Sequence, residues 1–233
     1  MRFNRYNLIE AVKNNDINKI NSILKSGKAE SNSKDKYCET ALMIASCKGN
    51  LEIVKLLVDN GADVNIKSDI GNTALMFASE YGQLDIVKYL VENGADINIK
   101  DDDGESALIH ALEDSTKKEK SLEIVQYLID NGADINTTNN YYGKTALMIS
   151  SSEGHLEMVK LLVENGADVK AKDKDKDGWT ALMRASWRGY SEIVKYLVKN
   201  GSDINIKNND GKTALDLADS EEIKEVLRKA GYK

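Results

Sequence analysis

The stretch Asp69–Asp101, DIGNTALMFASEYGQLDIVKYLVENGADINIKD, sets the plan of the chain, because most of the remaining sequence is an edited copy of it. It contains a Thr before an apolar run, then a Gly, a second amphipathic run and Asn-Gly-Ala-Asp. This order predicts a helix, a tight turn, a second helix and an extended loop. One such unit cannot bury its own apolar face, so the copies must stack on each other as a helical solenoid.

A Thr or Ser begins the first helix of each full copy, at intervals of about 33 residues or slightly more. These residues are Thr40, Thr73, Ser106, Thr145, Thr180 and Thr213. We therefore predict one domain, residues 1–233, built from units at 4–35, 36–68, 69–101, 102–139, 140–174, 175–208 and 209–233. The first and last units are degenerate and are interpreted as polar-faced caps. The inserted segment EDSTKKEKS is expected to form a surface loop between the two helices of its unit.

The composition limits the classes of function. The chain has 41% hydrophobic and 30% charged residues, and it contains no apolar run near the roughly 20 residues that cross a bilayer. We therefore expect no membrane association. The start, MRFNRYNLIEAVKNND, lacks the apolar core and cleavage site of a secretory signal. We expect a cytoplasmic protein, with secretion by a route that reads no such signal left open.

Charge and cysteine content narrow the partners. The formal net charge of −6 opposes the broad basic surface that non-specific nucleic-acid binding requires, and mildly favours a protein partner with a basic patch. Cys38 and Cys47 are too few for a disulfide framework or a four-ligand zinc site, so both are predicted to be free thiols. We expect a monomer that needs no cofactor.

The repeated pattern G-x-T-A-L-M-x-A-S-x-x-G-x-L-E-I-V-K-L-L-V-x-N-G-A-D-V-N resembles the ankyrin repeat family over essentially the whole chain. The resemblance implies an all-α ankyrin-repeat solenoid of helix-turn-helix units with hairpin-like loops between repeats, and a non-catalytic role in protein–protein interaction. The family usually has Thr-Pro-Leu-His where this chain has Thr-Ala-Leu-Met, so the preset φ of Pro and the polar tie of His are both missing. We expect weaker helix edges on the same fold. Cys38 stands where other copies have a loop Gly, which leaves the geometry of the first hairpin tip open.

Variation between the copies is the functional signal. After each repeat Thr, the residues one, two and five positions on stay Ala, Leu and Ala or Ser, which marks core, whereas those four, seven and eight positions on change. These three offsets share one helical face, which in the ankyrin family lines the concave surface. Trp, Tyr and Arg dominate binding hot spots, so we predict that this variable face and the hairpin tips bind a protein. The predicted residues are Tyr37, Ile70, Phe77, Tyr81, His110, Tyr141, Tyr142, Ile149, Trp179, Arg184, Trp187 and Arg188.

One loop offers a different chemistry. The segment DKDKDG at Asp173–Gly178 copies the first half of a calcium-binding loop, but Arg184 stands at the twelfth position, where a chelating Glu belongs. A solvated hairpin tip is the favoured interpretation, and a calcium-binding or enzymatic role centred on Asp173–Asp177 is the alternative. His110 and His155 lie beside no motif that would orient them for acid–base work. We therefore predict no enzyme, no catalytic residue and no metal ligand.

Overall fold

The computed structural model of the chain describes residues 6–26, 31–112, 118–174 and 177–231. Within these ranges the regular elements are fourteen helices, and no strand is formed. The chain divides into two compact units, Met1–Ala133 and Asp134–Lys233; the single domain 1–233 stays a prediction. No helix in the described ranges combines the length and the apolar character that a membrane crossing requires.

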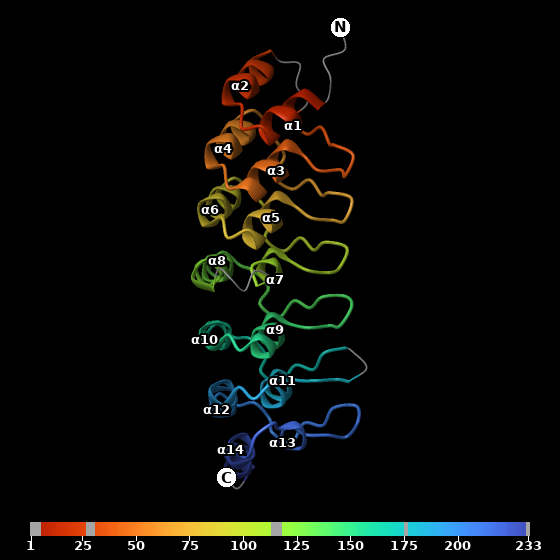
Figure 1. Cartoon of the computed structure of the whole chain (residues 1–233), viewed down its shortest axis with the longest axis vertical. Helices are drawn as coiled ribbons and strands as arrows, with labels where there is room; N and C mark the ends of the chain where they lie inside the picture. Colours follow the sequence, from red (N-terminus) through yellow and green to blue (C-terminus); the bar gives the residue numbers. More distant parts are fainter. Residues whose placement is uncertain (1–5, 27–30, 113–117, 175–176, 232–233) are drawn as a thin grey trace. The chain divides into compact units, whose positions relative to one another are not determined.

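Each unit is built from helix pairs. In the first unit the pairs are α1 (Tyr6–Lys13) with α2 (Ile17–Lys25), α3 (Ala41–Lys48) with α4 (Leu51–Asp59), α5 (Ala74–Glu80) with α6 (Leu84–Glu92), and α7 (Ala107–His110) with α8 (Lys118–Asp130). In the second unit they are α9 (Ala146–Glu153) with α10 (Leu156–Glu164), α11 (Ala181–Trp187) with α12 (Ser191–Lys199), and α13 (Ala214–Leu217) with α14 (Glu221–Gly231). Within each unit the first helices of the pairs form one row and the second helices another, and the loops extend from the side of the first helices (Figure 1). The predicted helix-turn-helix repeat is confirmed, including the helices of both caps. The loop predicted for EDSTKKEKS is wrong from Lys118 on, because α8 already begins there, and residues 113–117 lie outside the described ranges.

The first helices begin as the sequence predicts. The side chain of Thr40 accepts a hydrogen bond from the backbone N–H of Met43 at 3.3 Å, which satisfies one unpaired donor of the helix start. The same cap forms at Thr73, Thr145, Thr180 and Thr213. In return, Sδ of Met43 accepts the backbone N–H of Thr40 at 3.3 Å, and Met76 and Met183 make the same contact in their repeats. Thioether sulfur is a weak acceptor, but this contact partly replaces the polar tie that we expected to be missing.

The core lies between the helices of neighbouring repeats. First helices pack on first helices, as α3 does on α5 and α9 on α11. The residues predicted to face this contact, Ala41, Leu42 and Ala45, are buried almost completely. The alanines let the helix backbones approach, and each fully buried Leu contributes about 1.5–3 kcal/mol relative to an exposed one. The invariant offsets of the repeat are therefore confirmed as core.

Each hairpin is closed by a side-chain oxygen on its first residue. The carboxylate of Asp101 accepts the backbone N–H of Glu105 at 2.8 Å, and the backbone N–H of Asp101 donates to the carbonyl of Glu105 at 3.0 Å. The equivalent closing residues are Asp35, Ser68, Asn139, Asp173 and Asn208. Isolated antiparallel bridges, such as that between Lys100 and Ser106, extend the pairing. The hairpin-like loops are thereby confirmed.

Successive hairpin tips touch through their backbones. The N–H of Asp102 donates to the carbonyl of Ile70 at 3.1 Å, and a Cβ on Gly71 would lie only 2.7 Å from that nitrogen. Gly71 also has φ +84°, so this position requires Gly. Cys38, at the equivalent place in the first tip, has φ 57°. The first tip therefore keeps the left-handed turn, at a cost of about 1–2 kcal/mol for a residue with a side chain.

Asn residues after the second helices join each repeat to the next. Oδ1 of Asn65 accepts the backbone N–H of Asp96 at 2.8 Å, and its Nδ2 donates to the carbonyl of Gly94 at 3.0 Å. The same acceptance from a following repeat occurs at Asn32 and Asn136. Lys170 stands at this position in the repeat 140–174, and its side chain has no acceptor atom. The junction after residue 174 therefore lacks the Asn connection.

We predict that Asn65→Ala lowers the free energy of unfolding by about 1–3 kcal/mol, because two hydrogen bonds worth about 0.5–1.5 kcal/mol each are lost. The measurement is the urea unfolding midpoint. Asn205→Ala is the matched control, since Asn205 holds the same position in the repeat but bonds no later repeat in the described residues. An equal loss in both variants would contradict a role for the Asn in joining repeats.

Candidate functional site

The predicted site residues of the first unit differ widely in exposure. Tyr37 and Ile70, at hairpin tips, expose 52% and 58% of their surface. Tyr81 is also exposed, at the end of α5, and Phe77 is half-buried one turn earlier. His110 is buried, with 4% exposed. The hairpin tips and the end of α5 therefore offer contact area, whereas His110 can only support the surface from below.

Two of these exposed tyrosines have charged neighbours. The ammonium of Lys36 lies 4.5 Å from the ring centre of Tyr37, within the range of a cation–π contact. The negative charge of Glu80, with further contributions from Cys47 and from burial, raises the pKa of the Tyr81 phenol to about 12. The Tyr81 hydroxyl therefore keeps its proton over a wider pH range than a free phenol, and it already contacts Glu80 and Cys47.

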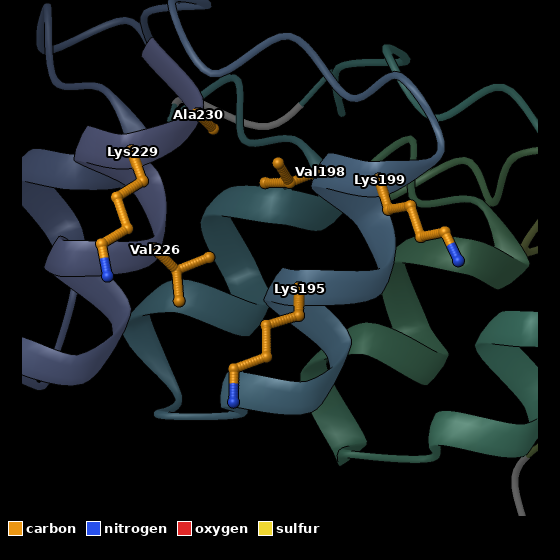
Figure 2. A pocket seen from close by; sticks show the side chains of 6 residues that line it. All are labelled: Lys195, Val198, Lys199, Val226, Lys229 and Ala230. Atoms are coloured by element: carbon orange, nitrogen blue, oxygen red, sulfur yellow. The ribbon is translucent and has the colours of Figure 1, made fainter. Parts of the chain in front are cut away.

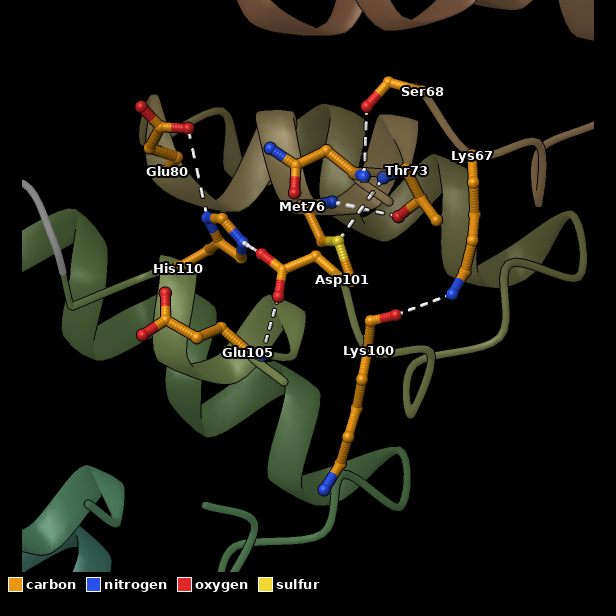
Figure 3. A network of polar contacts seen from close by, with 10 residues as sticks. Lys67, Ser68, Thr73, Met76, Glu80, Lys100, Asp101, Glu105 and His110 are labelled. Atoms are coloured by element: carbon orange, nitrogen blue, oxygen red, sulfur yellow. Dashed lines mark hydrogen bonds and ion pairs between the residues drawn. The ribbon is translucent and has the colours of Figure 1, made fainter. Parts of the chain in front are cut away.

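His110 belongs to a buried polar network (Figure 3). Its Nε2 lies 2.9 Å from Oδ2 of Asp101, while the other carboxylate oxygen accepts the backbone N–H of Glu105. Its Nδ1 lies 4.0 Å from the carboxylate of Glu80. Burial alone would raise the pKa of Asp101, but the hydrogen bonds from His110 and from the Glu105 backbone hold this pKa below its ordinary value. Asp101 is therefore a carboxylate that both closes its hairpin and fixes the imidazole.

The same network contains the ligand types of a metal site. Atoms of Asp101, Glu105 and His110 lie within 4.8 Å of one another. Both oxygens of Asp101 are already engaged, however, by the imidazole and by a backbone N–H. In the equivalent hairpin of the second unit, Arg184 occupies the position of His110 and pairs with Asp173. We therefore interpret this cluster as structural.

In the second unit, Arg184 forms an ion pair with Asp173. Asp173 is buried, and its other oxygen accepts the backbone N–H of Trp179 at 2.8 Å. One carboxylate therefore closes the hairpin that carries Trp179 and also anchors Arg184 in α11. This arrangement repeats that of Asp101 and His110.

Trp179, Arg184, Trp187 and Arg188 form one ladder of rings and guanidinium groups. The two indoles meet edge to face, with ring centres 5.7 Å apart and an interplanar angle of 88°. The guanidinium of Arg184 lies 5.9 Å from the ring centre of Trp179, and that of Arg188 lies 4.8 Å from that of Trp187. Edge-to-face rings and cation–π contacts each contribute about 0.5–1.5 kcal/mol. The structure thus brings together the four residues that the sequence predicted in this unit's α11 region.

The remaining predicted residues lie on the preceding repeat. Tyr141 and Tyr142 occupy a hairpin tip, with 73% and 48% exposed, and their ring centres are 6.4 Å apart. The ammonium of Lys144 lies 4.5 Å from the ring centre of Tyr142. Ile149 is half-buried in α9, which packs on α11.

A groove of about 460 Å³ lies beside the ladder, and we call it the tryptophan groove. It is lined by Lys144, Ser152, Glu153, Asp177, Trp179, Arg184, Trp187, Arg188, Lys212 and Leu217. These residues come from three successive repeats of the second unit. The groove contains all four ladder residues, so the predicted variable face here borders a concave feature.

A second groove, of about 420 Å³, lies between α12 and α14 (Figure 2). Val198, Val226 and Ala230 line it together with lysines. Lys195 is held by Glu192 and Glu222 at 2.8 and 3.0 Å. The residues that line this groove include no aromatic one, and two of its three lysines are already paired, since Lys229 also contacts Glu225 at 2.7 Å.

Sequence reasoning missed the pairing of closing residue and first-helix residue, although the signal was present. A neutral closing residue goes with an apolar residue four positions after the repeat Thr, as with Asn139 and Ile149. An Asp goes with a cationic one, as with Asp101 and His110 and with Asp173 and Arg184. Two more neutral pairs are Ser68 with Phe77 and Asn208 with Leu217. The exception, Asp35, is paired instead with Lys13 at the end of α1, 3.1 Å away.

The calcium alternative falls partly outside the described residues, because Asp175 and Lys176 are not among them. Of the described part, Asp173 is engaged by Arg184 and by the Trp179 backbone. A cation at this loop would have to displace a guanidinium from its carboxylate. The geometry of Asp173 therefore opposes calcium binding.

Two family models match the chain. One, described as ankyrin repeats (3 copies), matches residues 8–101 and 93–173, and the other, described as ankyrin repeats (many copies), matches residues 173–218. Among solved structures, the chain is similar to the ankyrin repeat domain of Bcl-3, described as a unique member of the IkappaB protein family. The TM-score is 0.84 and the sequence identity 28%, over 95% of this chain and 97% of that one. No curated protein sequence matches the chain.

We predict that Arg184→Leu destabilises the second unit by about 3–5 kcal/mol, because it leaves the buried Asp173 carboxylate without its cation. Adding Asp173→Asn should restore most of the loss, since Asn208 with Leu217 is the same combination in the next repeat. Chemical denaturation of the three proteins measures the effect. A double variant no more stable than Arg184→Leu would refute the pairing rule.

We also predict that millimolar calcium leaves the melting temperature nearly unchanged. A site filled at a thousandfold excess over its Kd would stabilise the protein by about 4 kcal/mol. Magnesium serves as the control for general salt effects. A saturable rise with calcium that Asp175→Ala abolishes would contradict this prediction.

Proposed function

This chain belongs to the ankyrin-repeat family, and we propose that it is a non-catalytic scaffold that binds a protein partner through its variable first-helix face and hairpin tips. Ankyrin repeats are generally protein–protein interaction modules. Fold alone does not fix a function, so the proposal rests on the site. The observation that carries it is the ladder of Trp179, Arg184, Trp187 and Arg188 beside the tryptophan groove.

The residue types of the ladder support recognition. Trp, Tyr and Arg are enriched among the residues that dominate binding energy. Trp187 exposes 52% of its surface, and an indole that is half in water contributes less to folding than a buried one would. The exposed Tyr141 and Tyr142 extend the same kind of surface to the preceding hairpin tip.

The ladder is also held in place before any partner arrives. Asp173 fixes Arg184 and the backbone of Trp179, and Trp179 in turn contacts the ring of Trp187. Immobilising a free side chain on binding costs about 0.5–1.5 kcal/mol. A surface whose side chains are already ordered avoids much of that cost, which favours affinity for a partner of matching shape.

The test is a pair of variants measured against the partner that intact protein captures from its source cells. We expect Trp187→Ala to weaken the complex by tens of fold, because truncating a central interface aromatic costs about 2 kcal/mol or more. Phe77→Ala tests the first unit in the same way. Both variants should remain folded, because Trp187→Ala removes only the contacts with Trp179 and Arg188, worth about 0.5–1.5 kcal/mol each.

Leu182→Ala is the control for folding. Leu182 is buried in the core with 1% exposed, so its truncation should cost about 2–5 kcal/mol of stability and affect binding only through unfolding. Full affinity of the Trp187 and Phe77 variants, or unfolding as severe as in the Leu182 variant, would show that the proposed surface is idle or part of the core.

A further inference from the structure

The charges around the tryptophan groove run against the net charge of the chain. Four cationic residues line the groove, Lys144, Arg184, Arg188 and Lys212, against the two carboxylates of Glu153 and Asp177. Arg184 is balanced by Asp173 beneath it, which leaves three cations against two carboxylates. The whole chain has a net charge of −6, so this groove is a local cationic exception.

The cationic character of this groove is associated with one position of the repeat, the residue just before the repeat Thr. The residue before the repeat Thr is Lys144, Trp179 or Lys212 in three successive repeats of the second unit. In the first unit the same row is acidic or neutral, with Glu39, Asn72 and Glu105. Lys212 and Arg188 are exposed, and neither forms an ion pair within the described part of the chain. Arg188 is therefore the cation most available to a ligand, since the charge of Lys212 also acts on the Asp216 carboxylate and helps to lower its pKa.

The groove also holds hydrogen-bond donors in excess. The indole N–H of Trp179 and the Nε–H of Arg184 are buried, and no acceptor for them lies among the described residues. A buried donor left without an acceptor costs about 1–3 kcal/mol. An acceptor on a ligand satisfies these donors only if the side chains that cover them move aside.

Apolar surface accompanies these charges. Trp187 is half exposed on one side of the groove, and Leu217 is half-buried on another. An indole ring and a leucine side chain together suit one large apolar side chain of a ligand. A surface with cations around an apolar contact is complementary to an acidic peptide that carries one hydrophobic side chain.

We propose that the tryptophan groove binds an acidic segment of the partner that carries one aromatic or large aliphatic side chain. This inference rests on the proposed function, since it names the chemistry of the partner at the same surface. The carboxylates of the segment pair with Arg188 and Lys212, and the apolar side chain packs against Trp187 and Leu217. Guanidinium groups bind carboxylates with two parallel hydrogen bonds, which adds geometric specificity.

The experiment uses the fluorescence of the full chain, because the protein has two tryptophans and both line this groove. The probe is a synthetic peptide of about ten residues, or about 33 Å when extended, with Asp and Glu around one phenylalanine. One control peptide has Lys in place of every acidic residue, and another has serine in place of the phenylalanine. We expect a saturable fluorescence change with the acidic peptide, weakened by added salt, and weaker binding of both controls.

Charge-reversal variants locate the binding. We expect Arg188→Glu and Lys212→Glu each to raise the Kd of the acidic peptide by about tenfold or more, an effect worth about 1.4 kcal/mol per factor of ten. Lys199→Glu makes the same change of charge in the second groove and should leave the Kd unchanged. Thermal melts confirm that each variant is folded. If one of the two groove variants fails to fold, the other is enough to locate the binding.

Three results would overturn the inference. They are no saturable change with the acidic peptide, equal or tighter binding of the basic peptide, and an equal effect of Lys199→Glu. The proposed function fails separately: a captured partner that depends on Trp187 but has no acidic segment would refute only the inference. A captured partner that binds with full affinity when Trp187 and Phe77 are truncated would refute the proposed function itself.

Discussion

The side-chain oxygen that closes each hairpin constrains more of the molecule than any other single group. It accepts backbone N–H groups that would otherwise be unpaired at the tip, and such groups are costly to leave without a partner. Where the oxygen belongs to Ser or Asn, the closing side chain carries no charge and needs no cation beside it. Where it belongs to Asp, the site contains a charge that is shielded from water, as with Asp173, and a cation must lie beside it. The choice of closing residue therefore decides whether a cation must lie nearby, which the neighbouring helix supplies at Asp101 and Asp173 and α1 supplies at Asp35.

Repetition explains why the fold could be predicted and the site only in part. The copies act as an internal alignment, so the helices, the Thr caps and the core positions Ala41, Leu42 and Ala45 were readable from the chain. The edge-to-face contact of Trp179 with Trp187 was not, because Trp179 lies in a loop with an insertion whose path no spacing determines. His110 was predicted at the surface from its offset, yet it is buried. Its Nε2 contacts the carboxylate of Asp101, so the imidazole lies against the hairpin rather than in water.

The charge around the tryptophan groove and the net charge of the chain predict different partner chemistry. The net charge of −6 acts over long distances, but at physiological ionic strength exposed charges are largely screened beyond about 8 Å. A ligand in the tryptophan groove therefore responds mainly to Arg188, Lys212 and their immediate neighbours. Reading partner chemistry from the total charge of a repeat protein averages over surfaces that differ from repeat to repeat.

Lys170 has a consequence for how the second unit moves. It stands where Asn joins other repeats to their successors, so the junction between the repeats 140–174 and 175–208 lacks that connection and is held instead by other bonds, such as those from Lys172 to Lys207 and from Ser202 to Val169. The tryptophan groove is lined by residues from both sides of this junction, among them Glu153 and Arg188. A ligand that touched both sides would add a connection there, so at a given concentration it would raise the free energy of opening this junction by the amount that binding stabilises the closed state.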